Sequence, residues 1–215
     1  MFRMTRTLCR SFCLAKPGIA VLGRCNEEER QMIRSVWEQL RHNIDHATEA
    51  TIWMNIIMND KFLVKETPEV IKLHAWAVEL LKKHRGEKYF LQKMSLFFTA
   101  KHSKHEQEFH LDYHEDAESF LIPMVPVSTL NSTMYMTSYS TATPTPGKYT
   151  LNRFGKDDFD LLDREGRDYA EIAQIVCREF TILHLQRNTV HRGIKNSSDY
   201  DRPMLDKYLP SCINW

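Results

Sequence analysis

The 215-residue sequence lacks a long apolar run, a Cys-x-x-Cys pair and an excess of either charge. Without some 18 consecutive apolar residues, no transmembrane helix is expected. Lys and Arg number 29 and Asp and Glu 28, so no strong field draws the chain to nucleic acid or to an anionic membrane. The five cysteines are odd in number and scattered. They argue against a zinc ribbon or a thioredoxin motif, and they suit reduced thiols in the cytoplasm.

What is present is the composition of an ordinary globular protein, with 42% hydrophobic and 27% charged residues. The length suits a single domain with a full core. The first 25 residues carry five basic residues and no acidic one. That pattern fits either an organellar transit peptide or a basic first helix of the domain.

Two helices are predicted in residues 1–88, which we expect to be the mainly helical part of the domain. Asn26 followed by Glu29 forms a capping-box pattern before an apolar face that recurs at helical spacing. A second helix is predicted to start at Thr67-Pro68 and to end at Gly86. The segment 44–65 is ambiguous.

After Gly86 the sequence favours strands, which gives an α+β chain. Five short segments are rich in β-branched, aromatic and aliphatic residues: "YFLQKMSLFFTA", "SFLIPMVPVS", "STMYMTSY", "EFTILHL" and "RPMLDKYL". Residues 89–215 are therefore predicted to form a barrel or jelly roll. The Ser/Thr/Pro-rich stretch at 137–147 is predicted to be a loop, either a plain connector or a mobile lid.

The stretch "EFHLDYHED" contains two His-x-Asp triplets, His110-Leu111-Asp112 and His114-Glu115-Asp116. Residues i and i+2 of a strand point to the same side, about 6.6 Å apart, so a His and an Asp at that spacing can share one metal ion. Residues i and i+4 are about 13 Å apart on a straight strand. We therefore expect at most one triplet to bind metal, and the geometry alone leaves both open.

A third histidine, His191, follows a predicted strand in "NTVHRG", and Arg202 comes eleven residues later. Two histidines and one carboxylate form the face that non-heme Fe(II) oxygenases use, leaving three positions open on a six-coordinate iron. An arginine near the distal histidine can clamp a carboxylate through two parallel N–H donors.

Together these segments resemble the phytanoyl-CoA dioxygenase family over most of the chain. "KPGIAVLGRCNEEERQMIRSVWEQL" resembles the opening strand and helix of the family, and "FHLDYHEDAESFLIPMVPVSTLNSTMYM" resembles its His-x-Asp segment and following strand pair. "FTILHLQRNTVHRGIKNSSDYDRPMLDKYL" resembles its distal His-Arg-Gly segment and the strand with the 2-oxoglutarate arginine. The opening match also favours a domain helix at 5–14 and a first strand at 18–22 over a transit peptide.

The resemblance implies a double-stranded β-helix with helices packed on it, and an Fe(II)- and 2-oxoglutarate-dependent dioxygenase that hydroxylates a small molecule with O2. Because the family places its first ligand about 21 residues before the position of Asn131, it implies His110, Asp112 and His191 as the iron ligands. Arg202 would bind the C5 carboxylate of 2-oxoglutarate, and Lys93 could also reach the cosubstrate.

The family pattern is not matched everywhere, since "TSYSTATP" stands where relatives often have Pro-Gly-Ser-His. The substrate is therefore open, and so is the choice between a monomer and a homodimer. Two other functions remain: a metal-binding isomerase or hydrolase on the same fold, and a non-enzymatic interaction domain with a decayed pocket.

Overall fold

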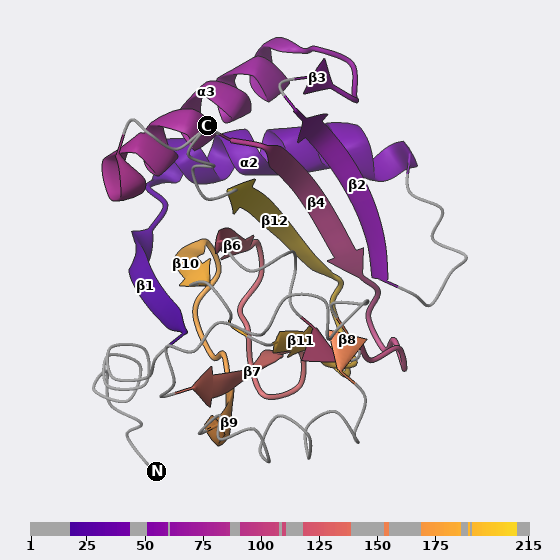
Figure 1. Cartoon of the computed structure of the whole chain (residues 1–215). Coiled ribbons are helices and arrows are strands. Elements are labelled where there is room, and N and C mark those ends of the chain that lie inside the picture. The colour runs from indigo at the N-terminus through magenta and orange to yellow at the C-terminus, as the bar shows by residue number, and fades with distance from the viewer. Residues whose placement is uncertain are drawn as a thin grey trace.

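The structure is a computed structural model that describes residues 18–43, 51–59, 61–86, 91–107, 109–110, 118–138, 153–154, 169–185, 189 and 191–209. Two antiparallel sheets and two helices make up the described part of the chain (Figure 1). The helices are α2 (Glu27–Leu40) and α3 (Pro68–Arg85), and a short 3-10 helix, η1 (Arg41–Asn43), follows α2.

The larger sheet has seven strands in the order β1-β10-β6-β12-β4-β2-β3. Their bounds are β1 Ile19–Arg24, β10 Thr181–Leu185, β6 Glu118–Pro123, β12 Arg202–Leu209, β4 Lys93–Thr99, β2 Thr51–Met58 and β3 Lys61–Phe62. The smaller sheet has five strands in the order β8-β5-β11-β7-β9. These are β8 Arg153–Phe154, β5 Phe109–His110, β11 His191–Gly193, β7 Thr133–Ser138 and β9 Tyr169–Gln174.

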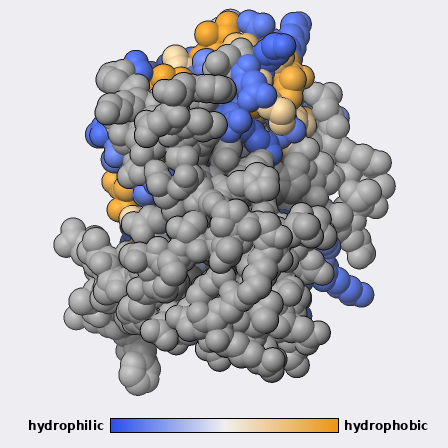
Figure 2. All heavy atoms as spheres, viewed as in Figure 1, coloured by the Kyte–Doolittle hydropathy of each residue, from blue (hydrophilic) through white to orange (hydrophobic). Residues whose placement is uncertain are grey.

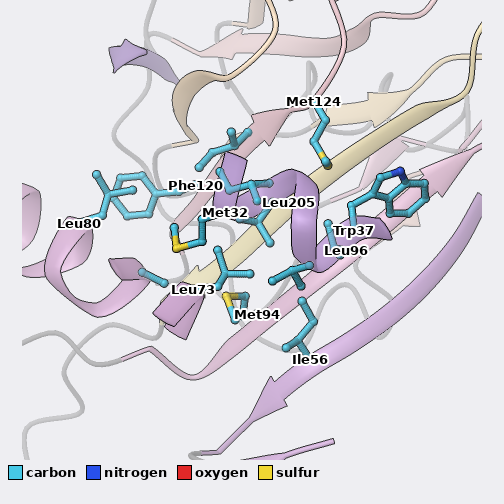
Figure 3. Packing of buried hydrophobic residues seen from close by; sticks show 14 of the residues in the cluster. Met32, Trp37, Ile56, Leu73, Leu80, Met94, Leu96, Phe120, Met124 and Leu205 are labelled. Carbon is cyan, nitrogen blue, oxygen red and sulfur yellow. The ribbon is translucent and has the colours of Figure 1, made fainter. Parts of the chain in front are cut away.

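The two faces of the larger sheet bury different layers of the core. One face packs against α2 and α3 through a cluster that includes Trp37, Leu73, Met94, Phe120 and Leu205 (Figure 3). The opposite face carries a second cluster, which includes Phe97, Leu121 and Met204. Tyr135 of the smaller sheet packs into the same cluster. The predicted α+β chain with helices packed on its sheets is thereby confirmed.

Both helices begin where the sequence predicts, and α3 also ends where it predicts. Asn26 accepts from the backbone N–H of Glu29 at 2.9 Å, and the Glu29 carboxylate accepts from the Asn26 N–H at 2.7 Å, which completes the capping box. Thr67 caps α3 ahead of a proline, and Gly86 ends it with φ of 89°, a value that favours glycine. Glu29 also accepts from the Trp76 indole at 2.8 Å, which ties α2 to α3.

The ambiguous segment 44–65 contains β2 and β3, and β1 precedes α2. The part before residue 89 therefore supplies three strands of the larger sheet as well as both helices. The predicted strands correspond to β4, β6, β7, β10 and β12. Residues 5–14 lie outside the described residues, as does 139–147 of the predicted loop, whose first two residues end β7.

The outer surface near α3 and β3 mixes charged and apolar side chains (Figure 2). Leu63 and Ile71 are 55% and 48% exposed, whereas most large apolar side chains of the larger sheet are buried. No helix in the described ranges is long and apolar enough to cross a membrane.

Lys207 is an unusual member of the layer between the helices and the larger sheet. Its side chain is 1% exposed, and Nζ lies 3.5 Å from the centroid of the Trp76 ring. Within the described residues, Nζ has no hydrogen-bond partner. Burial lowers the pKa of Lys207 well below its ordinary value, although Cys25 and Glu29 act in the opposite direction. Burying the charged form of Lys207 in this layer therefore costs free energy.

We predict that Lys207→Met stabilises the protein at pH 7 by on the order of 1 to 3 kcal/mol, because an apolar side chain avoids burying a charge. Since the folded pKa of Lys207 lies below the unfolded one, the unfolding free energy of the wild type rises with pH between the two values. The advantage of Lys207→Met should therefore shrink towards pH 10, as measured by chemical denaturation.

Lys72→Met is the matched control, because Lys72 is 60% exposed beside Glu28. That variant should change stability by less than about 0.5 kcal/mol at either pH. A loss of stability in Lys207→Met at pH 7 would contradict the account of Lys207.

Candidate active site

His191 begins β11, the central strand of the smaller sheet. It lies opposite His110 of β5 on one side and opposite Tyr135 of β7 on the other. Residues that face each other across antiparallel strands have their Cβ atoms about 4.5 to 5.5 Å apart. Positions 110 and 191 are therefore immediate neighbours, although they are 81 residues apart in the sequence.

The imidazole of His191 is held in one tautomer. Its ring is buried, and Nδ1 lies 3.0 Å from the carbonyl oxygen of Thr189. Because a carbonyl oxygen can only accept, Nδ1 is the donor, and the neutral ring carries its lone pair on Nε2. A backbone carbonyl that holds Nδ1–H is a common partner of histidines that bind metal through Nε2.

Arg202 begins β12 in the larger sheet, with its side chain only 2% exposed. Nη1 donates to the carbonyls of Asn131 and Ser132 at 2.7 and 3.0 Å, and Nη2 donates to Thr99 Oγ1 at 3.1 Å. A guanidinium has five N–H groups, and these contacts use three of them. Nε has no hydrogen-bond partner in the described part of the chain.

Among the described residues, Nε–H and one N–H of Nη2 have no acceptor. Nε and Nη2 form one edge of the planar guanidinium, and such an edge can bind a carboxylate through two parallel hydrogen bonds. Burial lowers the pKa of Arg202 to about 10, so the group is still charged at neutral pH. The described residues thus leave a buried cation with its carboxylate-binding edge open.

Gly193 is the point at which β11 approaches this guanidinium. A Cβ atom at position 193 would lie 2.8 Å from Gln107 Oε1 and 3.0 Å from Arg202 Nη2. Gln107 also binds both backbone groups of Gly193, accepting from its N–H at 2.8 Å and donating to its carbonyl at 3.0 Å. Gly193 shares a face of β11 with His191 and lies about 6.6 Å along the strand from it. The guanidinium therefore lies within reach of a short ligand bound at His191.

The other residues predicted for the site are not brought together by the described structure. Asp112 lies outside the described residues, as do His114 and Asp116, and the side chain of His110 is not described. Among the side chains that are described, no three His, Cys, Asp or Glu gather into a metal site.

Lys93 is far from Arg202. It begins β4 opposite Tyr208, whereas Arg202 lies opposite Thr99 at the other end of the same strand pair. Six residues of strand separate the two positions, or about 20 Å. The register therefore does not support a shared ligand for Lys93 and Arg202.

Sequence reasoning proposed Arg202 as a candidate but did not identify the groups that surround it. Thr99 and Gln107 carried no signal, because their roles depend on segments that meet only in the fold. The glycine of the His-Arg-Gly segment was a usable signal, since a glycine beside a candidate ligand indicates a close approach of the backbone.

No family model and no curated protein matches the chain. Solved structures do match it in fold. The non-heme alpha-ketoglutarate-dependent carbocyclase SnoK has a TM-score of 0.63 at 14% identity, over 97% of this chain and 85% of that chain. HygX from Streptomyces hygroscopicus, with nickel and 2-oxoglutarate bound, has a TM-score of 0.60 at 15% identity, over 98% and 88%.

A third match is the epimerase SnoN in complex with Fe3+, alpha-ketoglutarate and nogalamycin RO. Its TM-score is 0.64 at 14% identity, over 90% of this chain and 79% of that chain. The chain spans only 48% of another match, EvdMO1, at a TM-score of 0.60 and 12% identity. The chain therefore has the double-stranded β-helix fold of these solved structures.

Proposed function

We propose that the chain is a non-heme Fe(II)- and 2-oxoglutarate-dependent dioxygenase that acts on a small molecule. The observation that carries this proposal is the open Nε–Nη2 edge of a buried Arg202. This edge lies within reach of a short ligand bound at His191. A buried guanidinium costs free energy unless its donors find acceptors, so an open edge is best explained by a carboxylate ligand.

The metal would be held by His110, Asp112 and His191. Two observations support this set: His191 carries its lone pair on Nε2, and His110 is its register neighbour. Asp112 follows His110 at the i+2 spacing that puts two side chains on one face of a strand. The donor set of two imidazoles and one carboxylate suits Fe(II) and leaves three coordination positions for ligands.

Arg202 would bind the C5 carboxylate of 2-oxoglutarate through Nε–H and Nη2–H. With its other edge fixed by the carbonyls of Asn131 and Ser132, the guanidinium has little freedom to turn, so it would orient the cosubstrate towards the histidines. When bound, iron and 2-oxoglutarate would supply O2 activation coupled to decarboxylation, which amino-acid side chains cannot supply.

The layer between the sheets would keep water away from this chemistry. Phe97, Leu121 and Met204 are buried on the face of the larger sheet that also carries Arg202, and Tyr135 is buried opposite His191. Apolar walls of this kind strengthen the Arg202–carboxylate interaction and exclude side reactions.

The matched structures support the cofactors but leave the outcome of the reaction open. HygX is described with nickel and 2-oxoglutarate bound, and SnoN with Fe3+ and alpha-ketoglutarate. SnoK is described as a carbocyclase and SnoN as an epimerase, so the fold serves outcomes other than hydroxylation. We further propose that the chain belongs to the phytanoyl-CoA dioxygenase family and hydroxylates its substrate.

The function is tested by succinate release from 2-oxoglutarate, measured with and without Fe(II) across a panel of small metabolites. We expect succinate release that requires Fe(II) and rises with the true substrate.

Arg202→Lys should raise the 2-oxoglutarate concentration needed for half-maximal succinate release by about tenfold or more, because Lys cannot form the two parallel bonds, while metal content stays near normal. Unchanged 2-oxoglutarate affinity in Arg202→Ala would contradict the role of Arg202.

The metal register is tested by His110→Ala and His114→Ala, which remove the two alternative histidines one at a time. We expect His110→Ala to lose Fe(II) binding and His114→Ala to keep it, because position 110 is a register neighbour of His191. Metal content after anaerobic loading and desalting is the measurement. The reverse result would show that His114 and Asp116 form the site.

Gly193→Ala tests the close approach of β11 to Arg202. The added methyl group would meet Arg202 Nη2 at 3.0 Å and Gln107 Oε1 at 2.8 Å. Overpacking of this kind costs about 1 to 3 kcal/mol, so 2-oxoglutarate affinity should fall roughly 5- to 150-fold.

The double variant Gly193→Ala/Gln107→Ala is the matched control, because it removes the clash with Gln107 and keeps the clash with Arg202. We expect it to bind 2-oxoglutarate as weakly as Gly193→Ala. Full recovery of affinity would instead assign the effect to Gln107. Calorimetric titration of the Mn(II)-loaded protein reports all three affinities.

A further inference from the structure

The connection between β11 and β12 is organised by one buried amide, that of Asn196. Its side chain is 0% exposed. Nδ2 donates to the carbonyls of Thr99 and Tyr200 at 3.2 and 2.9 Å, and Oδ1 accepts from the N–H and the hydroxyl of Ser198 at 3.2 and 2.6 Å. An amide side chain has two N–H donors and two acceptor lone pairs, and these contacts use all four.

The two carbonyls that Asn196 joins flank Arg202. Thr99 is the register partner of Arg202, and its Oγ1 accepts from Arg202 Nη2 at 3.1 Å. Tyr200 lies two residues before Arg202 in the chain. The Nδ2 group of Asn196 therefore holds the end of β4 and the residues before β12 at a fixed separation. Arg202 begins β12 at this point and donates to Thr99 at the end of β4.

A second contact ties the same two segments at the surface. The N–H of Lys101 donates to Asp201 Oδ1 at 3.0 Å, and that contact is exposed. The Asn196 contacts are buried or partly buried, where the loss of hydrogen bonds to two carbonyls costs more than at the surface. Asn196 is therefore the stronger determinant of where β12 begins.

We propose that Asn196 is a positioning residue for the distal carboxylate of the cosubstrate. It does not touch the ligand. It fixes the start of β12 against the end of β4, so that the Nε–Nη2 edge of Arg202 points to where the carboxylate binds. This inference rests on the proposed function of the site.

Asn196→Asp tests the inference with nearly the same side-chain shape. The substitution replaces the two N–H donors with an oxygen that faces the carbonyls of Thr99 and Tyr200, so β12 must shift at its start. The measurement is the affinity of the Mn(II)-loaded protein for two ligands, 2-oxoglutarate and 2-oxopentanoate. The second ligand has the same carbon chain with a methyl group in place of the C5 carboxylate.

In the wild type we expect 2-oxoglutarate to bind at least about tenfold more tightly than 2-oxopentanoate, because only the former uses the open edge of Arg202. In Asn196→Asp that preference should fall by about tenfold or disappear. The affinities for Mn(II) and for 2-oxopentanoate should change little. A residue with a purely structural role would lower stability without a selective loss of this preference.

Ser198→Ala is the matched control. It removes the hydroxyl that binds Asn196 Oδ1 and the Tyr200 carbonyl, and it keeps both Nδ2 contacts. It should lower thermal stability and leave the ligand preference unchanged. If Asn196→Asp does not fold, Asn196→Ser keeps one donor, and we expect an intermediate preference.

The possible failures are distinguishable. A wild type that binds both ligands equally overturns the proposed function, and this inference with it. A wild-type preference that survives in Asn196→Asp or in Asn196→Ser overturns the inference alone. Equal losses of preference in the Asn196 variants and in Ser198→Ala also overturn it, because they would show a general loosening of the connection.

Discussion

Everything at the candidate site depends on a guanidinium buried between two sheets. Removing a charged group from water is costly, and the cost is tolerable only when its donors are satisfied. Protein groups occupy one edge of Arg202, and within the described residues they leave the other edge open. The guanidinium of Arg202 is the cation of an ion pair, and the carboxylate of the proposed ligand would be its anion.

Several features of the fold hold the guanidinium of Arg202 between the two sheets. The register between β4 and β12 puts the Thr99 hydroxyl beside Arg202, and the connection from β11 is fastened to the same two strand ends by Asn196. Position 193 has no side chain, which lets β11 come close to the guanidinium. The smaller sheet then places position 110 beside His191. A short ligand bound at His191 can reach the guanidinium of Arg202.

Much of this fold could be predicted from local chemistry. The starts of both helices and the end of α3 were predictable because their caps are local in sequence, as with Asn26 and Glu29. The strand β2 was missed because it lies between β4 and β3 and is apolar on both faces, so it shows no alternation. The strands β5, β8 and β11 have only two or three residues, too few to carry any periodicity.

The site divides in the same way. His191 and Arg202 could be proposed as candidates from their types and spacing, whereas the place of Lys93 relative to Arg202 could not be judged without the strand register. The acceptors of Arg202 are backbone carbonyls and one hydroxyl, contributed by segments about 70 and 103 residues away. Backbone carbonyls are present at every position of a sequence, so only the fold can show which of them meet a given side chain.

The most direct test of the account is an anaerobic titration of the Fe(II)-loaded protein with 2-oxoglutarate, followed by visible absorption. A 2-oxo acid that binds Fe(II) through its carboxylate and keto oxygens gives a charge-transfer band that neither component shows alone. The account predicts this band, with saturation at one equivalent of 2-oxoglutarate per chain. Fe(II) binding without the band would contradict it and favour a metal-dependent isomerase or hydrolase, and no Fe(II) binding at all would favour an interaction domain.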